Sequence, residues 1–256
     1  MNKLGVESII SNICGKNKDM NSHLFSADMK LADVIHADYS LLLLLHRFGI
    51  NLGFGDKTVR ECCEANHVSC TLFLMICNVY SNEQYLPTEK EIEGIGTDVD
   101  QLIAYLKNSH SYYLENRMLS IQEQLKEISE GCEQQHQQIL NLFFNEYKNE
   151  VIRHFDYEEV TVFPYISNMV KGARPGDYEI GVFRENHSNI DDKLNDLKNI
   201  IMKYLPGDTL SDMRIRVLFG IFALEEDLSK HSLIEDKILI PLVMKLEQRY
   251  AQDCYY

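Results

Sequence analysis

Two eleven-residue stretches decide the predicted fold: HFDYEEVTVFP at 154–164 and HSLIEDKILIP at 231–241. Each begins with a histidine, has a glutamate four residues later, and ends on a proline six residues after that. Residues four apart share one face of an α-helix, so an imidazole and a carboxylate at this spacing aim at one point. Each stretch therefore predicts a helix that presents a His–Glu pair to a common site.

Another histidine precedes each stretch by the same interval, at positions 110 and 187. Four positions therefore recur at one constant offset: His110, His154, Glu158 and Pro164 become His187, His231, Glu235 and Pro241. In a chain with 39 acidic residues and nine histidines, a single His-x-x-x-acid pair is also expected on exposed helix surfaces. The shared offset of all four positions favours a duplicated site instead.

The repeated polar residues have the chemistry of a two-metal site. Carboxylates can bridge two ions while imidazoles fill terminal positions, and His with Glu but without Cys suits iron or manganese. A structural zinc site is usually tetrahedral and contains cysteine. Apolar residues follow both pairs, which places the pairs near the core, where an unpaired polar group is costly. The predicted ligands are His110, His154, Glu158, His187, His231 and Glu235.

Long helical patterns dominate the chain and predict an all-α fold. Four such stretches, near 98–130, 133–169, 178–204 and 209–249, are joined by short Gly- or Pro-containing breaks. This arrangement favours an up-down-up-down four-helix bundle. The predicted division is an extension (1–27), a small helical domain (28–80), a polar linker (81–97) and the bundle (98–250).

Composition limits the classes of partner. The net charge is −14, and no cluster of Lys and Arg is present, which excludes nucleic acid and anionic membrane surfaces as expected partners. The longest apolar run, 41–45, is far short of the roughly 20 residues that cross a bilayer. The segment Met1–Lys18 shows no signal-peptide pattern, so we expect a cytoplasmic protein. Seven cysteines, an odd number, do not predict a disulfide framework.

The two eleven-residue stretches resemble the hemerythrin-like domain of the iron-sulfur cluster repair di-iron proteins. LADVIHADYS (31–40) and GINLGFGDKTVRECC (49–63) resemble the short N-terminal domain of the same family. The resemblance implies two oxo- or hydroxo-bridged non-haem iron ions, with the four histidines as terminal ligands and Glu158 and Glu235 as bridges. It also implies a stress protein that helps to restore clusters damaged by nitric oxide or oxidants.

The partners implied are a small ligand (nitric oxide, dioxygen or peroxide) and damaged iron-sulfur proteins, with a homodimer also among the expectations. The sequence departs from the family where Gly53-Phe54 replaces the usual Cys-Cys pair, although Cys63 is kept. Without the pair, its thiolate chemistry is not expected here. Asn186 stands where the family often has an acid. Glu150, one turn before His154, is then either an outer-sphere acid near the metal or an ordinary solvated residue.

Three functions remain open, and the sequence does not settle whether the protein is an enzyme. The leading hypothesis is stress-response repair, by iron delivery or by reduction of nitric oxide or an oxidant. One alternative is a hemerythrin-like protein that binds or senses dioxygen or nitric oxide without turnover. Reversible carriers have a fifth histidine ligand, and only His136, in a polar segment, is left for that role. Another alternative is donation of labile iron to a partner.

Overall fold

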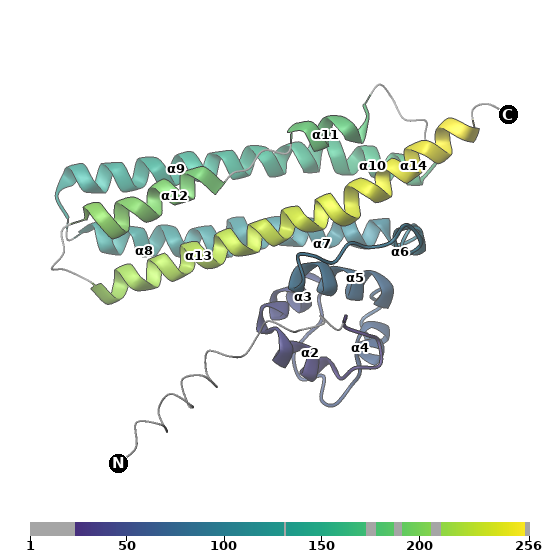
Figure 1. The fold of residues 1–256 in the computed structure, drawn as a ribbon. Helices are drawn as coiled ribbons and strands as arrows, with labels where there is room; N and C mark the ends of the chain where they lie inside the picture. The colour runs from purple at the N-terminus through teal and green to yellow at the C-terminus, as the bar shows by residue number, and fades with distance from the viewer. Residues whose placement is uncertain (1–23, 131, 173–177, 187–190, 206–210, 254–256) are drawn as a thin grey trace, which may run out of the picture.

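The computed structural model describes residues 24–130, 132–172, 178–186, 191–205 and 211–253. These residues form helices and, apart from one isolated bridge between Lys30 and Thr58, no β-structure, which confirms the all-α prediction. Figure 1 shows a long helical bundle with a group of short helices against one side. Among the described helices, none is both long and apolar enough to cross a membrane.

The bundle consists of four rods that alternate in direction (Figure 1), as the sequence predicts. Each rod includes one π-helical segment, η2 to η5, and the third rod is described in two parts, before and after residues 187–190. In chain order the rods are α7 (Val99–Tyr112), η2 (Tyr113–Arg117) and α8 (Met118–Glu130); α9 (Gln134–Tyr157), η3 (Glu158–Val162) and α10 (Phe163–Val170); α11 (Ile180–Asn186), α12 (Asp191–Asn199) and η4 (Ile200–Tyr204); and α13 (Ser211–Ile234), η5 (Glu235–Leu239) and α14 (Ile240–Asp253).

Apolar residues at helical spacing give each rod one buried face. In α8 the buried apolar residues are Met118, Ile121, Leu125 and Ile128, which recur every three or four positions. Such a stripe faces the partner helices, while the polar residues between its members face solvent. Complete burial of each such side chain contributes about 1.5–3 kcal/mol, which makes the interior of the bundle the main source of its stability.

The amino-terminal residues 24–81, called the small helical region below, are short helices. They are α2 (Leu31–Ala37), the 3₁₀ turn η1 (Tyr39–Leu41), α3 (Leu42–Arg47), α4 (Val59–Ala65) and α5 (Cys70–Ser81). Asp38 separates α2 from the next helices because its backbone is extended and its carboxylate accepts the Ser40 amide at 3.0 Å. Thr58 and Ser69 cap α4 and α5, because each side chain accepts the backbone amide three residues later. The described cysteines of the chain are free thiols.

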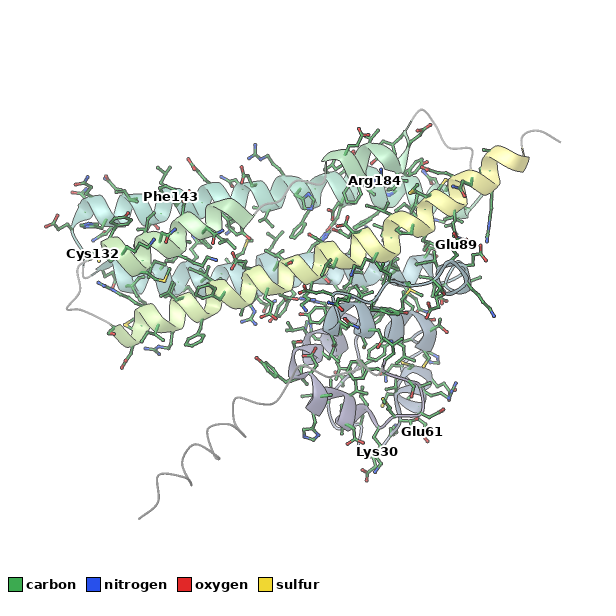
Figure 2. All side chains as sticks on the ribbon, viewed as in Figure 1. Lys30, Glu61, Glu89, Cys132, Phe143 and Arg184 are labelled. Carbon is green, nitrogen blue, oxygen red and sulfur yellow. The ribbon has the colours of Figure 1, made fainter. Side chains whose placement is uncertain are left out.

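One hydrophobic core joins the small helical region to the bundle. Buried residues of α5, among them Leu72 and Ile76, belong to the same cluster as Val162 and Ile238 of the bundle. Figure 2 shows side chains filling the space between the two parts. A second cluster fills the far half of the bundle, around α8, α12 and the start of α13. The small region therefore contacts the half of the bundle that contains η3 and η5.

The segment 81–97, predicted as a polar linker, contains a packed helix. Thr88 begins α6 (Glu89–Gly94) with a capping box, in which the Thr88 hydroxyl accepts the Glu91 amide and the Glu91 carboxylate accepts the Thr88 amide. Ile92 and Ile95 are buried in the shared core. The sequence analysis missed this helix because most residues of the segment are polar and only two of its apolar residues are buried. The division into domains stays a prediction.

Candidate metal centre

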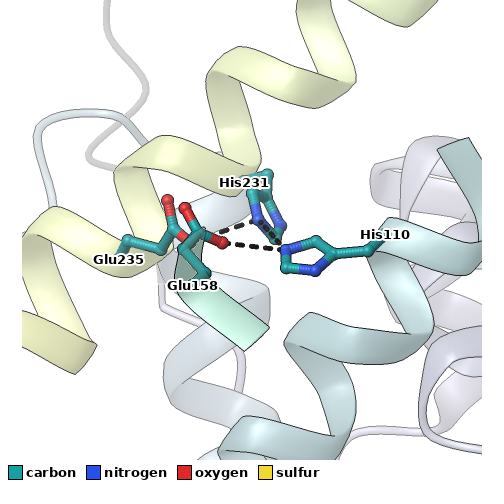
Figure 3. Close-up of side chains that lie close together, drawn as sticks. All are labelled: His110, Glu158, His231 and Glu235. Atoms are coloured by element: carbon teal, nitrogen blue, oxygen red, sulfur yellow. Dashed lines mark hydrogen bonds and ion pairs between the residues drawn. The ribbon is translucent and has the colours of Figure 1, made fainter. Parts of the chain in front are cut away.

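Four predicted ligands, from three of the four rods, meet in the bundle interior. His110 comes from α7, Glu158 from the start of η3, His231 from α13 and Glu235 from the start of η5. One ligand atom of each lies within 4.8 Å of those of the other three, and all four residues are buried. Figure 3 shows the two carboxylates side by side and facing the two imidazoles. The duplicated sequence pattern therefore corresponds to one compact cluster.

Glu158 lies between two histidines. Its Oε2 is 3.0 Å from His110 Nε2, and its Oε1 is 2.8 Å from His154 Nε2. Each oxygen of Glu158 thus faces a separate imidazole nitrogen, and the resemblance implies that this carboxylate would bridge two ions. On the other motif, Glu235 Oε1 is 3.2 Å from His231 Nε2. His110 and His231 approach each other at 3.2 Å between their Nε2 atoms.

Five of the six predicted ligands thus form one network of contacts, and the sixth, His187, lies outside the described residues. The donor set fits a metal ion. The Glu158 and Glu235 side chains are both 0% exposed, and burying two carboxylates so close together is costly unless a cation compensates them. That these residues bind metal remains a proposal, which is developed below.

The repeated proline has a structural explanation. Pro164 and Pro241 are each the second residue of the α-helix that follows a π-helical segment. Proline has no N–H to continue the regular hydrogen-bond ladder, so the ladder must change near it. The two segments begin at Glu158 and Glu235, and such π-helical turns often occur at functional sites. In both motifs, therefore, a wider π-helical turn begins at the buried glutamate, and the proline follows two residues after the end of that turn.

Aromatic rings enclose the two buried imidazoles. The His110 ring stacks on Phe155, with a centroid separation of 3.9 Å and an angle of 9° between planes. Tyr113 stands perpendicular to His231, with a centroid separation of 5.7 Å and an angle of 87°. Phe163 also stacks beside His110, at 5.8 Å. These contacts restrict rotation of the imidazoles and exclude water from this side of the cluster.

Glu159 is a site residue that the sequence analysis missed. Its Oε1 lies 2.9 Å from His110 Nδ1. An N–H on Nδ1 that donates to this carboxylate leaves the lone pair of Nε2 directed at the cluster, the usual arrangement around a metal-bound histidine. The signal was present in the repeat, because the offset that relates Glu158 to Glu235 also relates Glu159 to another acid, Asp236.

Asp227 is the second residue that was missed. It lies one helical turn before His231, just as the predicted acid Glu150 lies one turn before His154, and the same offset relates the two acids. Asp227 is only 3% exposed and is bonded to Arg47 and Tyr80 of the small helical region. The role predicted for Glu150 stays a prediction.

His136 is too far from the cluster to be a fifth ligand. It lies near the start of the continuous helix α9, whereas His154 lies near the end of that helix. At the α-helical rise per residue, the two histidines are about 27 Å apart along the helix. His136 itself is partly buried, whereas the polar residues next to it in the sequence predict an exposed position. His136 therefore does not supply a fifth histidine of the kind that reversible oxygen carriers use.

Comparison with known families agrees with this geometry. Residues 97–248 match the family model described as Hemerythrin HHE cation binding domain, and this range includes all six predicted ligands. Searches of curated proteins and of solved structures found no match to the chain.

Proposed function

Since the chain belongs to the hemerythrin HHE cation-binding domain family, we propose that it holds two non-haem iron ions inside the bundle. Its proposed ligands are His110, His154, Glu158, His187, His231 and Glu235. The observation that carries the proposal is the position of Glu158, whose two oxygens face two different histidines. Mixed imidazole and carboxylate ligands favour iron or manganese over structural zinc.

The proposed biological role is repair of iron-sulfur clusters damaged by nitric oxide or oxidants, in the cytoplasm. Bound iron would supply redox chemistry and a coordination position for a small ligand. The chain's own residues provide buried surroundings in which Phe155 and Tyr113 border the imidazoles and Glu159 orients one of them. The resemblance of 31–40 and 49–63 to the N-terminal domain of the repair family supports this role. Repair could proceed in two ways, by delivery of iron to the damaged protein or by reduction of nitric oxide or an oxidant at the site.

One observation favours a second candidate, a protein that binds or senses dioxygen or nitric oxide without turnover. Gly53 occupies the position of the family's first paired cysteine and has φ +91°, a conformation that side chains other than glycine adopt only with strain. The neighbouring Phe54 packs against the core. This loop is thus built around glycine and an aromatic ring, and the thiol chemistry associated with repair is missing from it.

Iron content tests the metal proposal. The full chain, reconstituted anaerobically with ferrous iron and freed of excess, should retain two irons and show the visible absorption of a bridged diferric site after oxidation. E158Q and E235Q should each lose most of that iron. D156N, which removes an exposed acid from the same helix as His154, is the control and should retain it. Well under two irons in the wild type, or unchanged iron in both glutamine variants, would refute the proposal.

Reaction with nitric oxide separates the two candidate functions. In the presence of a chemical reductant, a repair protein that reduces nitric oxide consumes many equivalents, and one that delivers iron restores the cluster of an apo iron-sulfur protein. A sensor takes up nitric oxide only in stoichiometric amount and transfers no iron. Measurement of gas consumed and of cluster restored on the same iron-loaded sample distinguishes these outcomes.

A further inference from the structure

Arg47, the last residue of α3, brings a charge from the small helical region into the bundle. It is 1% exposed, and its Nη2 donates to Asp227 Oδ2 at 2.5 Å. The Tyr80 hydroxyl of α5 donates to the other oxygen, Oδ1, at 2.7 Å. Both oxygens of this buried carboxylate are therefore held by the small helical region.

Asp227 is joined to the metal-site histidine through its backbone as well. Its carbonyl is the one that accepts the His231 amide in a regular α-helix, and the Tyr113 hydroxyl donates to the same carbonyl at 3.0 Å. The Tyr113 ring stands perpendicular to the His231 imidazole, and the Arg47 guanidinium lies 5.0 Å above the centre of that ring. Arg47 thus touches the two groups that fix the turn of α13 leading to His231.

The two central histidines are held by different means. His110 Nδ1 has the carboxylate of Glu159 as its partner. His231 Nδ1, although buried, has no hydrogen-bond partner among the described residues. Apart from the contacts of its Nε2 with Glu235 and His110, the direction of the His231 ring therefore depends on its helix backbone and on the rings beside it, among them Tyr113.

The charge of Arg47 persists in this environment. Burial by itself lowers the pKa of the guanidinium, but the neighbouring Tyr113, Tyr105 and Asp227 raise the pKa overall. Arg47 and Asp227 therefore form a paired set of buried charges. Buried pairs of this kind contribute little net stability compared with apolar residues, but removal of one partner leaves the other as an uncompensated buried charge, which is strongly destabilising.

We propose that Arg47 is a positioning residue for the metal centre: together with Asp227 and Tyr113 it fixes the turn of α13 that aims His231. The small helical region then forms part of the support of the metal site, in addition to its share in the core. The proposal rests on the proposed iron-binding function.

Iron retention in the full-length protein tests this role. Wild type, R47K, R47M and R47M/D227N are loaded with ferrous iron, and the rate of iron loss to a chelator is measured together with the visible spectrum. The double variant removes both buried charges, and so avoids leaving Asp227 unpaired if R47M folds poorly. The control is K245M. It removes the contact between Lys245 of the bundle and Glu93 of the preceding segment, which are 2.8 Å apart at the surface. Unfolding of each metal-free variant is measured in parallel.

We expect R47K and R47M/D227N to lose iron about tenfold faster than the wild type, in the range found for outer-sphere partners of metal ligands. Their visible bands should shift, and K245M should match the wild type. Metal-free R47M/D227N should unfold close to the wild type. Wild-type iron retention and spectrum in both R47K and R47M/D227N would overturn the proposal. A wild-type protein that takes up no iron would instead refute the proposed function itself.

Discussion

At the scale of single residues, the site depends on carboxylates that differ in their neighbours. Glu158 is fully buried and faces two imidazoles, whereas Glu159, the next residue, reaches the outer nitrogen of His110 from a half-exposed position. One turn of helix thus supplies both a ligand candidate and the acid that orients another ligand.

Loss of Glu159 should weaken metal binding without removing a ligand. In E159A the His110 imidazole keeps its contact with Phe155 but loses the acceptor for its Nδ1 proton. Removal of such an outer-sphere partner typically costs about 10–100-fold in metal affinity. Competition with a chelator of known affinity measures the change, and D156A, at an exposed position of the same helix, is the matched control. Equal affinities in E159A and D156A would contradict this role.

At the scale of helices, short-range signals in the sequence set where some of the short helices begin. Thr58 and Thr88 each start a helix through a capping box with a glutamate three residues later. Hydrogen bonds from the backbone amide and hydroxyl of Thr88 lower the pKa of Glu91. The cap on α6 matters to the core because it fixes the helix that carries Ile92.

Replacement of the α6 cap should reduce stability in a pH-dependent way. T88A is expected to lower the free energy of unfolding by about 1 kcal/mol at pH 7. Because the pKa of Glu91 is lowered in the folded protein, its contribution is complete above the ordinary glutamate pKa of about 4.3 and is lost as the pH falls through the folded value. The difference between T88A and wild type should therefore shrink at pH 3. Urea unfolding at both pH values checks this, and a difference that grows on acidification would contradict it.

At the scale of the whole molecule, the core spans the small helical region and one half of the bundle. Side chains of the two parts cover one another in this core. Partial unfolding of one part therefore exposes apolar surface of the other to water. The cluster of His110, Glu158, His231 and Glu235 lies in this same half, since η3 and η5 contribute Val162, Ile238 and Leu239 to the shared core.

Unfolding of the metal-free chain should accordingly be cooperative across the predicted domain boundary. Calorimetry is expected to show one transition for the small helical region together with the adjoining half of the bundle. I76A, at a fully buried position of α5, should destabilise that transition by about 2–5 kcal/mol. A separate early transition that alone moves in I76A would show that the small region unfolds independently.

Iron removal should destabilise the same unit. A ligand that binds only the folded state adds RT ln(1 + [L]/Kd) to its stability, so chelation is expected to lower the melting temperature. The two carboxylates left without a cation add to this loss. In E158Q/E235Q the repulsion between the buried acids is removed, so its metal-free form should melt at or above metal-free wild type. Thermal melts of both proteins with and without chelator measure the effect, and a chelator-insensitive wild type would contradict it.

The sequence by itself determined the long helices of the bundle and led to the proposed ligand set, because both follow from spacing along one chain. The interval between His154 and Glu158 fixes a shared helical face, and the constant offset of the repeat identifies the counterparts of both. Only the tertiary structure decided which side chains meet across helices. Arg47 reaches Asp227 across 180 positions of sequence, and Glu159 reaches His110 across 49. Such contacts depend on how packed helices are rotated and displaced relative to one another, and local periodicity does not specify that relation.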